Sequence, residues 1–167
     1  AGGTALLTLA GAMAGLSSAA WSQEATFVMS TNEVGAPTYN PVKATMLNTA
    51  TSLIYDRLVV QDADQSFHPP LGGSGEEARD GMQWIFPLKK GVTSHGGEPF
   101  NAAAIAAWIP SFTGTDNEYM VGAIDKVEVV DDYTVKFVMK HPEPNLLFNF
   151  SSSFMGIPAP KAYKDLG

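Results

Sequence analysis

Apolar and polar residues alternate on both sides of an acidic turn in the second half of the chain. A period of two places every second side chain on the same face of a strand, and a short polar turn joins antiparallel strands. The pattern therefore predicts a β-hairpin with strands at residues 126–130 and 134–139. The same period predicts a strand at 82–88, in which Pro87 lacks an N–H and suits an edge strand or a bulge.

Other segments have apolar residues at the spacing that is typical of helices. Apolar residues recur every three or four positions over residues 45–58, which predicts a helix that runs into a strand at 58–60. Asn101 can cap a helix at 102–109, and Pro110 would end or kink it. The other expected elements are a strand at 25–30, a turn at 62–66 with a return strand at 67–68, a polar loop at 72–81, and helices at 145–150 and 161–166.

Composition indicates a folded domain of mixed secondary structure. The chain has 167 residues, of which 45% are hydrophobic and 16% charged, with 16 glycines and 11 prolines. That length supports one compact domain with a core, and the turn residues favour a mixed or strand-rich fold over a helical bundle. A net charge of -7 argues against nucleic-acid binding. The absence of cysteine excludes disulfides, thiolate metal sites and cysteine nucleophiles.

The first 22 residues carry no charge and are rich in Ala, Leu and Gly. They are typical of the apolar region of an export signal without its basic start, with cleavage before Gln23 or, as a second option, before Trp21. A membrane anchor is the alternative, although the run is short for a span of ~20 residues. We expect residues 1–22 to be the remnant of a signal peptide.

One segment resembles nucleotide-binding and hydrolase motifs, but its residues do not fit either motif. Residues 73–78 match a dinucleotide fingerprint in form, but prolines stand where its strand should be and Glu76 and Glu77 would repel phosphate. The same segment lacks the second glycine of a nucleophile elbow, because Glu76 follows Gly75. We therefore expect a solvated loop.

The 3 histidines could in principle join two acidic side chains around a metal. Yet His68, His95 and His141 have no zinc-motif spacing, and the loop with Asp62 and Asp64 lacks the glycine and final Glu of a calcium loop. We expect surface or turn-stabilising roles for the histidines, and no metal or cofactor.

Several aromatic side chains could line a pocket or fill the core. Trp84, Phe86, Phe137 and Phe148 carry this ambiguity, and aromatic residues at strand spacing are more often core. We expect core positions and no catalytic site.

Four segments in the same order resemble one known family. They are IYDRLV at 54–59, DGMQWIFPLKKGV at 80–92, VEVVDDYTV at 127–135, and residues 142–167. From about Phe27 to Gly167 the chain resembles the N-terminal part of the extracellular solute-binding proteins, family 5, which serve ABC importers of the dipeptide and oligopeptide type.

The chain departs from the family pattern at a few positions. Gly75 stands where members usually carry Trp, and Ser94 and Gly97 stand where Phe and Asp are typical. Ala103 or Ala104 replaces an acidic residue. A buried Trp replaced by Gly would cost several kcal/mol of stability if nothing refilled the space, so these departures bear on stability more than on family membership.

The resemblance implies a mixed α+β fold of the periplasmic-binding-protein type, in which two lobes close on ligand. Residues 23–44 would supply the first strand and loop of the ligand-binding lobe, and residues 45–167 the family's small extra domain. The loop after the first strand faces the cleft in members, so Thr31, Asn32, Glu33 and Val34 are the candidate ligand contacts. A plain surface loop is the alternative for these four residues.

The implied function is non-enzymatic: a monomeric receptor, periplasmic or tethered to the outer face of the membrane, captures a peptide-like solute and delivers it to an ABC permease. Because affinity depends on closure, we expect this segment alone to bind weakly or not at all. A degenerate or truncated paralogue with a structural or interaction role is one alternative, and a secreted hydrolase is another. The sequence does not select among peptides, metal chelates, glutathione-like compounds and oligosaccharides.

Overall fold

The computed structural model describes residues 39–44, 49–73 and 75–165. The chain divides into two units, Ala1–Ser30 and Thr31–Gly167, and every described residue belongs to the second unit. The predicted leader, the strand expected at 25–30 and the four candidate ligand contacts lie outside the described residues.

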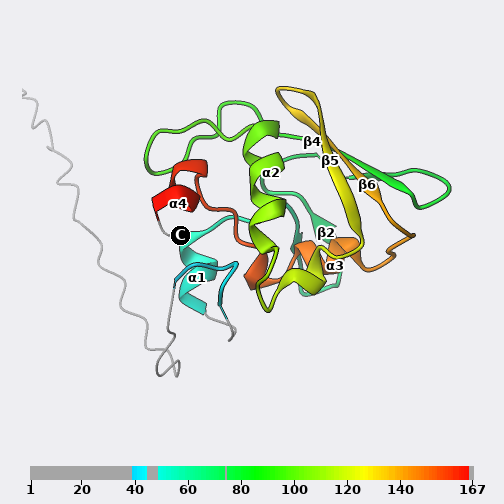
Figure 1. The fold of residues 1–167 in the computed structure, drawn as a ribbon, viewed down its shortest axis with the longest axis horizontal. Helices are drawn as coiled ribbons and strands as arrows, with labels where there is room; N and C mark the ends of the chain where they lie inside the picture. Colours follow the sequence, from blue (N-terminus) through cyan, green and yellow to red (C-terminus); the bar gives the residue numbers. More distant parts are fainter. Residues whose placement is uncertain (1–38, 45–48, 74, 166–167) are drawn as a thin grey trace, which may run out of the picture. The chain divides into compact units, whose positions relative to one another are not determined.

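An antiparallel sheet in the strand order β3-β4-β6-β5 organises this unit (Figure 1). The predicted hairpin is confirmed as β5, Ile124–Asp131, and β6, Thr134–Met139. Val127 lies opposite Phe137 in the register. Two irregularities, between Ile124 and Lys126 and between Val129 and Asp131, interrupt the pairing of β5 with β6.

The predicted strand at 82–88 is confirmed as β4, Gln83–Pro87. Of the two alternatives offered for Pro87, an edge strand or a bulge, the edge strand is wrong, because β4 has a neighbour on each side. β4 pairs with β6 on one side and with β3, Glu76–Glu77, on the other. Pro87 is tolerated because it is the last residue of the strand, where its carbonyl still accepts a hydrogen bond of 2.8 Å from the Gly73 N–H. The loop expected at 72–81 therefore contains a short edge strand.

The turn after residue 60 forms the predicted small hairpin. β1, Val60–Gln61, pairs with β2, Phe67–His68, in a separate two-stranded sheet. The described part of the preceding helix is α1, Thr49–Ile54, so the helix ends earlier than the expected residue 58. Leu58 and Val59 are buried, but they precede the paired residues rather than forming the strand expected at 58–60.

Local capping explains the main helix. α2, Ala102–Trp108, begins at Asn101, whose side chain accepts a hydrogen bond of 3.0 Å from the Ala104 N–H, as predicted. Pro110 falls in the 3-10 helix η1, Ile109–Phe112, which follows α2 directly. The other helices are η2, Glu118–Met120; α3, Leu146–Phe150; η3, Ser153–Met155; and α4, Pro160–Asp165.

Aromatic rings from the sheet and the helices form the core. Phe86 on β4 meets Phe137 on β6 edge to face, with the ring centroids 5.5 Å apart. Phe150 on α3 lies 5.2 Å from Phe137 and 5.9 Å from Trp108 on α2. These packed rings, together with buried Trp84, confirm the predicted core positions.

Phe148 is the exception among the predicted core aromatics, since it is 59% exposed. It lies on α3 two positions before buried Phe150, and residues two apart face different sides of a helix. The space beside Gly75 is filled: a Cβ at that glycine would collide with the Phe86 ring. The Phe86 ring therefore occupies the space beside Gly75 in this fold.

Among the described residues, no helix has both the length and the apolar character that a membrane crossing requires.

Candidate functional site

A largely apolar cleft of about 680 Å³ opens on the described surface. Its walls come from the end of α1, the loop after β4, and the segment that leads into α4. The lining residues are Leu53, Ile54, Tyr55, Asp56, Leu71, Val92, Thr93, Ser94, His95, Gly96, Glu98, Pro99, Phe100, Ala104, Ile157, Pro158, Ala159, Pro160, Lys161 and Ala162.

Backbone hydrogen bonds shape the loop wall of this cleft. The Ser94 N–H donates to the Glu98 carbonyl at 2.8 Å, and the Gly97 N–H donates to the Ser94 carbonyl at 2.9 Å. Gly97 has a φ of 82°, a left-handed conformation that glycine adopts without steric cost. The turn geometry thus accounts for Gly97 at the position where the resemblance would place an aspartate.

One contact ties this loop to α4. Glu98 Oε1 accepts a hydrogen bond of 3.2 Å from the backbone N–H of Lys161. Exposed side chains of His95, Lys161 and Asp56 stand among the lining residues, so the cleft offers both signs of charge. Partial burial raises the pKa of Tyr55, which keeps its phenol neutral at physiological pH.

The chemistry of the cleft is that of binding. Apolar walls with a few polar groups favour an apolar ligand portion through desolvation. The Ser94 hydroxyl accepts a hydrogen bond of 3.2 Å from the Glu98 N–H, and its role is to shape the turn. Across the described ranges, no group of three or more His, Asp or Glu side chains is placed to hold a metal ion.

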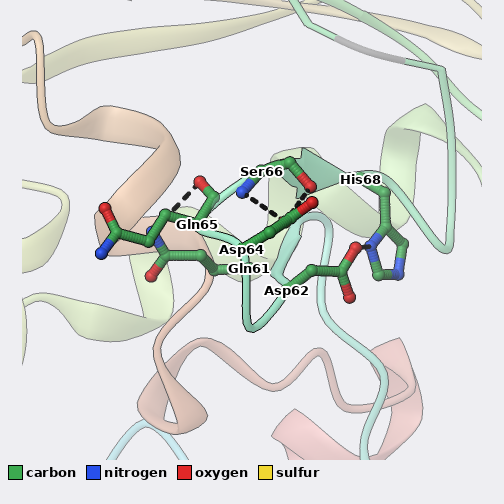
Figure 2. A network of polar contacts seen from close by, with 6 residues as sticks. All are labelled: Gln61, Asp62, Asp64, Gln65, Ser66 and His68. Carbon is green, nitrogen blue, oxygen red and sulfur yellow. Dashed lines mark hydrogen bonds and ion pairs between the residues drawn. The ribbon is translucent and has the colours of Figure 1, made fainter.

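The three histidines are separated in the structure. Figure 2 shows His68 facing Asp62 across the small hairpin, with Nδ1 and Oδ2 2.7 Å apart. His141 Nδ1 lies 3.2 Å from the Pro142 carbonyl, and His95 lines the cleft. His68 therefore has the turn-supporting role that we expected, while the place of His95 in a cleft wall was not predicted.

The turn that carries Asp62 is held by its own side chains. Asp64 Oδ1 accepts hydrogen bonds from the Ser66 hydroxyl at 2.6 Å and the Ser66 N–H at 3.0 Å (Figure 2). These bonds lower the pKa of Asp64, with the hydroxyl contributing most. The acidic residues of this turn thus stabilise local backbone.

Thr31, Asn32, Glu33 and Val34, the predicted ligand contacts, lie outside the described residues, so their contribution to a site remains a prediction. The cleft itself escaped sequence reasoning because its walls come from three segments far apart in the chain. The one available signal was the glycine-rich loop after β4, whose composition predicts a turn but not what the turn faces.

Comparison with known proteins identifies relatives of this unit. The family model described as "Bacterial extracellular solute-binding proteins, family 5 Middle" matches residues 66–166. The "Glutathione-binding protein GsiB" of Pectobacterium atrosepticum is 30% identical over 123 residues, which cover 71% of this chain and 24% of that protein. The "Nickel-binding periplasmic protein" of Escherichia coli is 42% identical over 57 residues, 34% of this chain and 11% of that protein.

A solved structure agrees with these matches. The crystal structure of NikA from Brucella suis in complex with Fe(III)-EDTA has a TM-score of 0.66 and 29% identity, and covers 75% of this chain and 26% of that one. This likeness confirms the predicted mixed α+β fold of the periplasmic-binding-protein type. The chain spans about a quarter of the length of these relatives, 24% of one and 26% of another.

Proposed function

This chain belongs to the bacterial extracellular solute-binding proteins, family 5, and we propose that its protein is the substrate-binding component of an ABC importer. In this role it captures a peptide-like small solute and delivers it to a membrane permease. The observation that carries the proposal is the family match over residues 66–166. Members of this family are binding proteins rather than enzymes, which sets the secreted hydrolase aside.

The names of the relatives support a peptide-like solute. One binds glutathione, itself a tripeptide, and a structural neighbour from Helicobacter pylori, DppA, was solved with the peptide STSA. That neighbour is 24% identical, so it contributes fold likeness and an example of a ligand. One relative is named for binding nickel and one structural neighbour holds Fe(III)-EDTA, so a metal or metal chelate is the main competing solute class.

Thr31, Asn32, Glu33 and Val34 remain our proposed contacts. A loop at this point can offer backbone N–H and C=O groups to an extended peptide, as an added strand does. In this proposal residues 1–22 are the export leader, residues 23–44 belong to the ligand-binding lobe, and residues 45–167 form the small domain. The protein acts as a monomer in the periplasm, free or tethered to the membrane surface.

A thermal-shift screen of the full-length protein tests the function. The panel contains reduced glutathione, di- to tetrapeptides, an oligosaccharide and a nickel–histidine complex. A ligand at 100 times its Kd adds about 2.7 kcal/mol of stability, so the correct class raises the Tm by several degrees. Stabilisation by a peptide or by glutathione is the expected result. A shift with the chelate or the sugar alone would contradict the peptide-like class, and no shift at all would favour the structural paralogue.

Calorimetry of the 167-residue chain with the same peptides tests the need for a second lobe. We expect no binding at micromolar concentration, because closure around the ligand supplies much of the affinity in two-lobed proteins. Micromolar binding by this chain alone would contradict that requirement.

A further inference from the structure

Asn117 is a buried polar side chain whose hydrogen-bond partners are backbone carbonyls far away in the sequence. It is 4% exposed and occupies the N-cap position of η2, where its side chain makes no capping hydrogen bond. Its amide nitrogen instead donates to the carbonyl of Val42 at 3.1 Å and to the carbonyl of Ala44 at 2.8 Å. These partners are 75 and 73 residues away in sequence, so the contact joins two distant parts of the unit.

The contact uses the full donor capacity of the side chain. A primary amide has two N–H groups, and two separate carbonyls accept from this one nitrogen. Val42 and Ala44 are themselves buried, whereas Lys43 between them is exposed. A buried carbonyl without a hydrogen-bond partner costs free energy. Moving residues 42–44 away from Asn117 would therefore destabilise the fold.

Hydrogen bonds to Asn40 also hold this segment locally. Asn40 accepts hydrogen bonds from the N–H groups of nearby residues: its Oδ1 from Val42 at 3.1 Å and its carbonyl from Lys43 at 3.2 Å. These bonds shape a turn at 41–43.

A close approach holds the segment at a second point. A Cβ placed on Gly156 would lie 2.7 Å from Tyr55 Cβ and 3.3 Å from Pro41 Cβ. Glycine is therefore the residue whose size permits this three-way contact. Asn117 and Gly156 fix successive residues of one short stretch from different parts of the chain.

We propose that Asn117 is a positioning residue that makes residues 41–44 a rigid joint between the proposed ligand-binding loop and the small domain. The inference rests on the proposed function, in which Thr31–Val34 contact the solute shortly before this joint. A rigid joint fixes the chain against the small domain just after that segment. It also requires any lobe closure to take place elsewhere in the protein.

The rate of trypsin cleavage after Lys43 measures how readily the joint opens, because Lys43 is an exposed cleavage site on an anchored backbone. Proteases need several residues of local unfolding before they cut, so the cleavage rate follows the opening of the segment. In the unaltered chain we expect cleavage after Lys43 to be at least tenfold slower than after Arg79, which is exposed in a loop. Equal initial rates at these two sites, measured by mass spectrometry, would overturn the proposal without any variant.

Variants then assign the effect to the side chain. Asn117→Ala removes both donors, and Asn117→Asp replaces them with a carboxylate that faces two carbonyl oxygens. We expect each variant to raise the ratio of cleavage after Lys43 to cleavage after Lys136 by roughly tenfold, equivalent to about 1.4 kcal/mol of local opening. Lys136 lies in β6, between two paired strands, so its cleavage reports global unfolding.

Val135→Ala is the matched control. It removes volume from a fully buried position on β6 and leaves Asn117 in place, so it accelerates cleavage after Lys136 through global unfolding and does not raise the ratio of cleavage after Lys43 to cleavage after Lys136. An unchanged ratio in both Asn117 variants, or an equal rise in the control, would overturn the proposal. The assay contains no ligand, so its failure would refute the joint and leave the proposed solute binding intact, and a failed ligand screen would do the reverse.

Discussion

The fit between Gly75 and Phe86 makes a quantitative prediction about core packing. Because a Cβ at Gly75 would collide with the Phe86 ring, Gly75→Ala forces the ring or the backbone beside β3 to shift. Overpacking of this kind costs about 1–3 kcal/mol. Phe86→Ala has the opposite defect, since it removes a fully buried ring that packs against Trp84, Phe137 and Phe150, and it costs about 3–5 kcal/mol.

The double variant separates this local conflict from a general effect on folding. Once the ring is absent, the methyl group introduced by Gly75→Ala has room, so the added cost of that substitution should nearly vanish. We expect the double variant to be as stable as Phe86→Ala alone, with a coupling free energy of about 1–3 kcal/mol between the two positions.

Equilibrium unfolding in urea, followed by circular dichroism, measures the free energy of unfolding for the four proteins of this cycle. Equal m-values show that the variants expose similar surface on unfolding. Two costs that add to within about 0.5 kcal/mol would refute the packing argument, because independent sites behave in that way. A Gly75→Ala variant as stable as the parent would refute it as well.

Two further predictions concern the helix cap and the charged residues of the sheet. Asn101→Ala should lower the free energy of unfolding in urea by about 1 kcal/mol, because the Ala104 N–H loses its acceptor. Asn101→Asp keeps an acceptor and should keep most of the stability. Equal losses of stability in the two variants would contradict the capping role. Lys126 and then Lys136, each 2.5 Å from Glu128, lower the pKa of Glu128 to about 2 from its ordinary value of 4.5. Because the pKa of Glu128 is lower in the folded than in the unfolded state, its stabilisation of the fold is present above about pH 4.5 and is lost as the pH falls toward 2. Glu128→Gln should therefore make the free energy of unfolding less sensitive to pH in that window. A titration midpoint of the Glu128 carboxyl near 4.5, measured by NMR, would contradict this.

Elements with local signals were predictable from sequence. The β5–β6 hairpin has alternating apolar residues on both sides of a polar turn, and α2 has a cap residue followed by an alanine-rich run. β3 had no such signal, because Glu76 and Glu77 form a strand only by pairing with Ile85 and Trp84. Sequence periodicity cannot detect a partner that lies in another segment.

The candidate site was harder to predict than the fold. Its cleft joins Leu53, His95 and Ile157, which lie in three separate segments and share no spacing pattern. The same limit applied to Asn117, because its hydrogen-bond partners lie 75 and 73 residues upstream. Chemistry assembled by tertiary contacts becomes visible only when the segments are placed in space.

The irregular course of β5 bears on how this protein tolerates high concentration. β5 is an edge of the four-stranded sheet, and Val129 and Val130 near its end are 50% and 57% exposed. A smooth apolar margin of this kind would invite another molecule to add a strand and start aggregation. The two irregularities of β5 and the charged Lys126 and Glu128 disturb that template, so they oppose the addition of a strand from another molecule and favour a dispersed state.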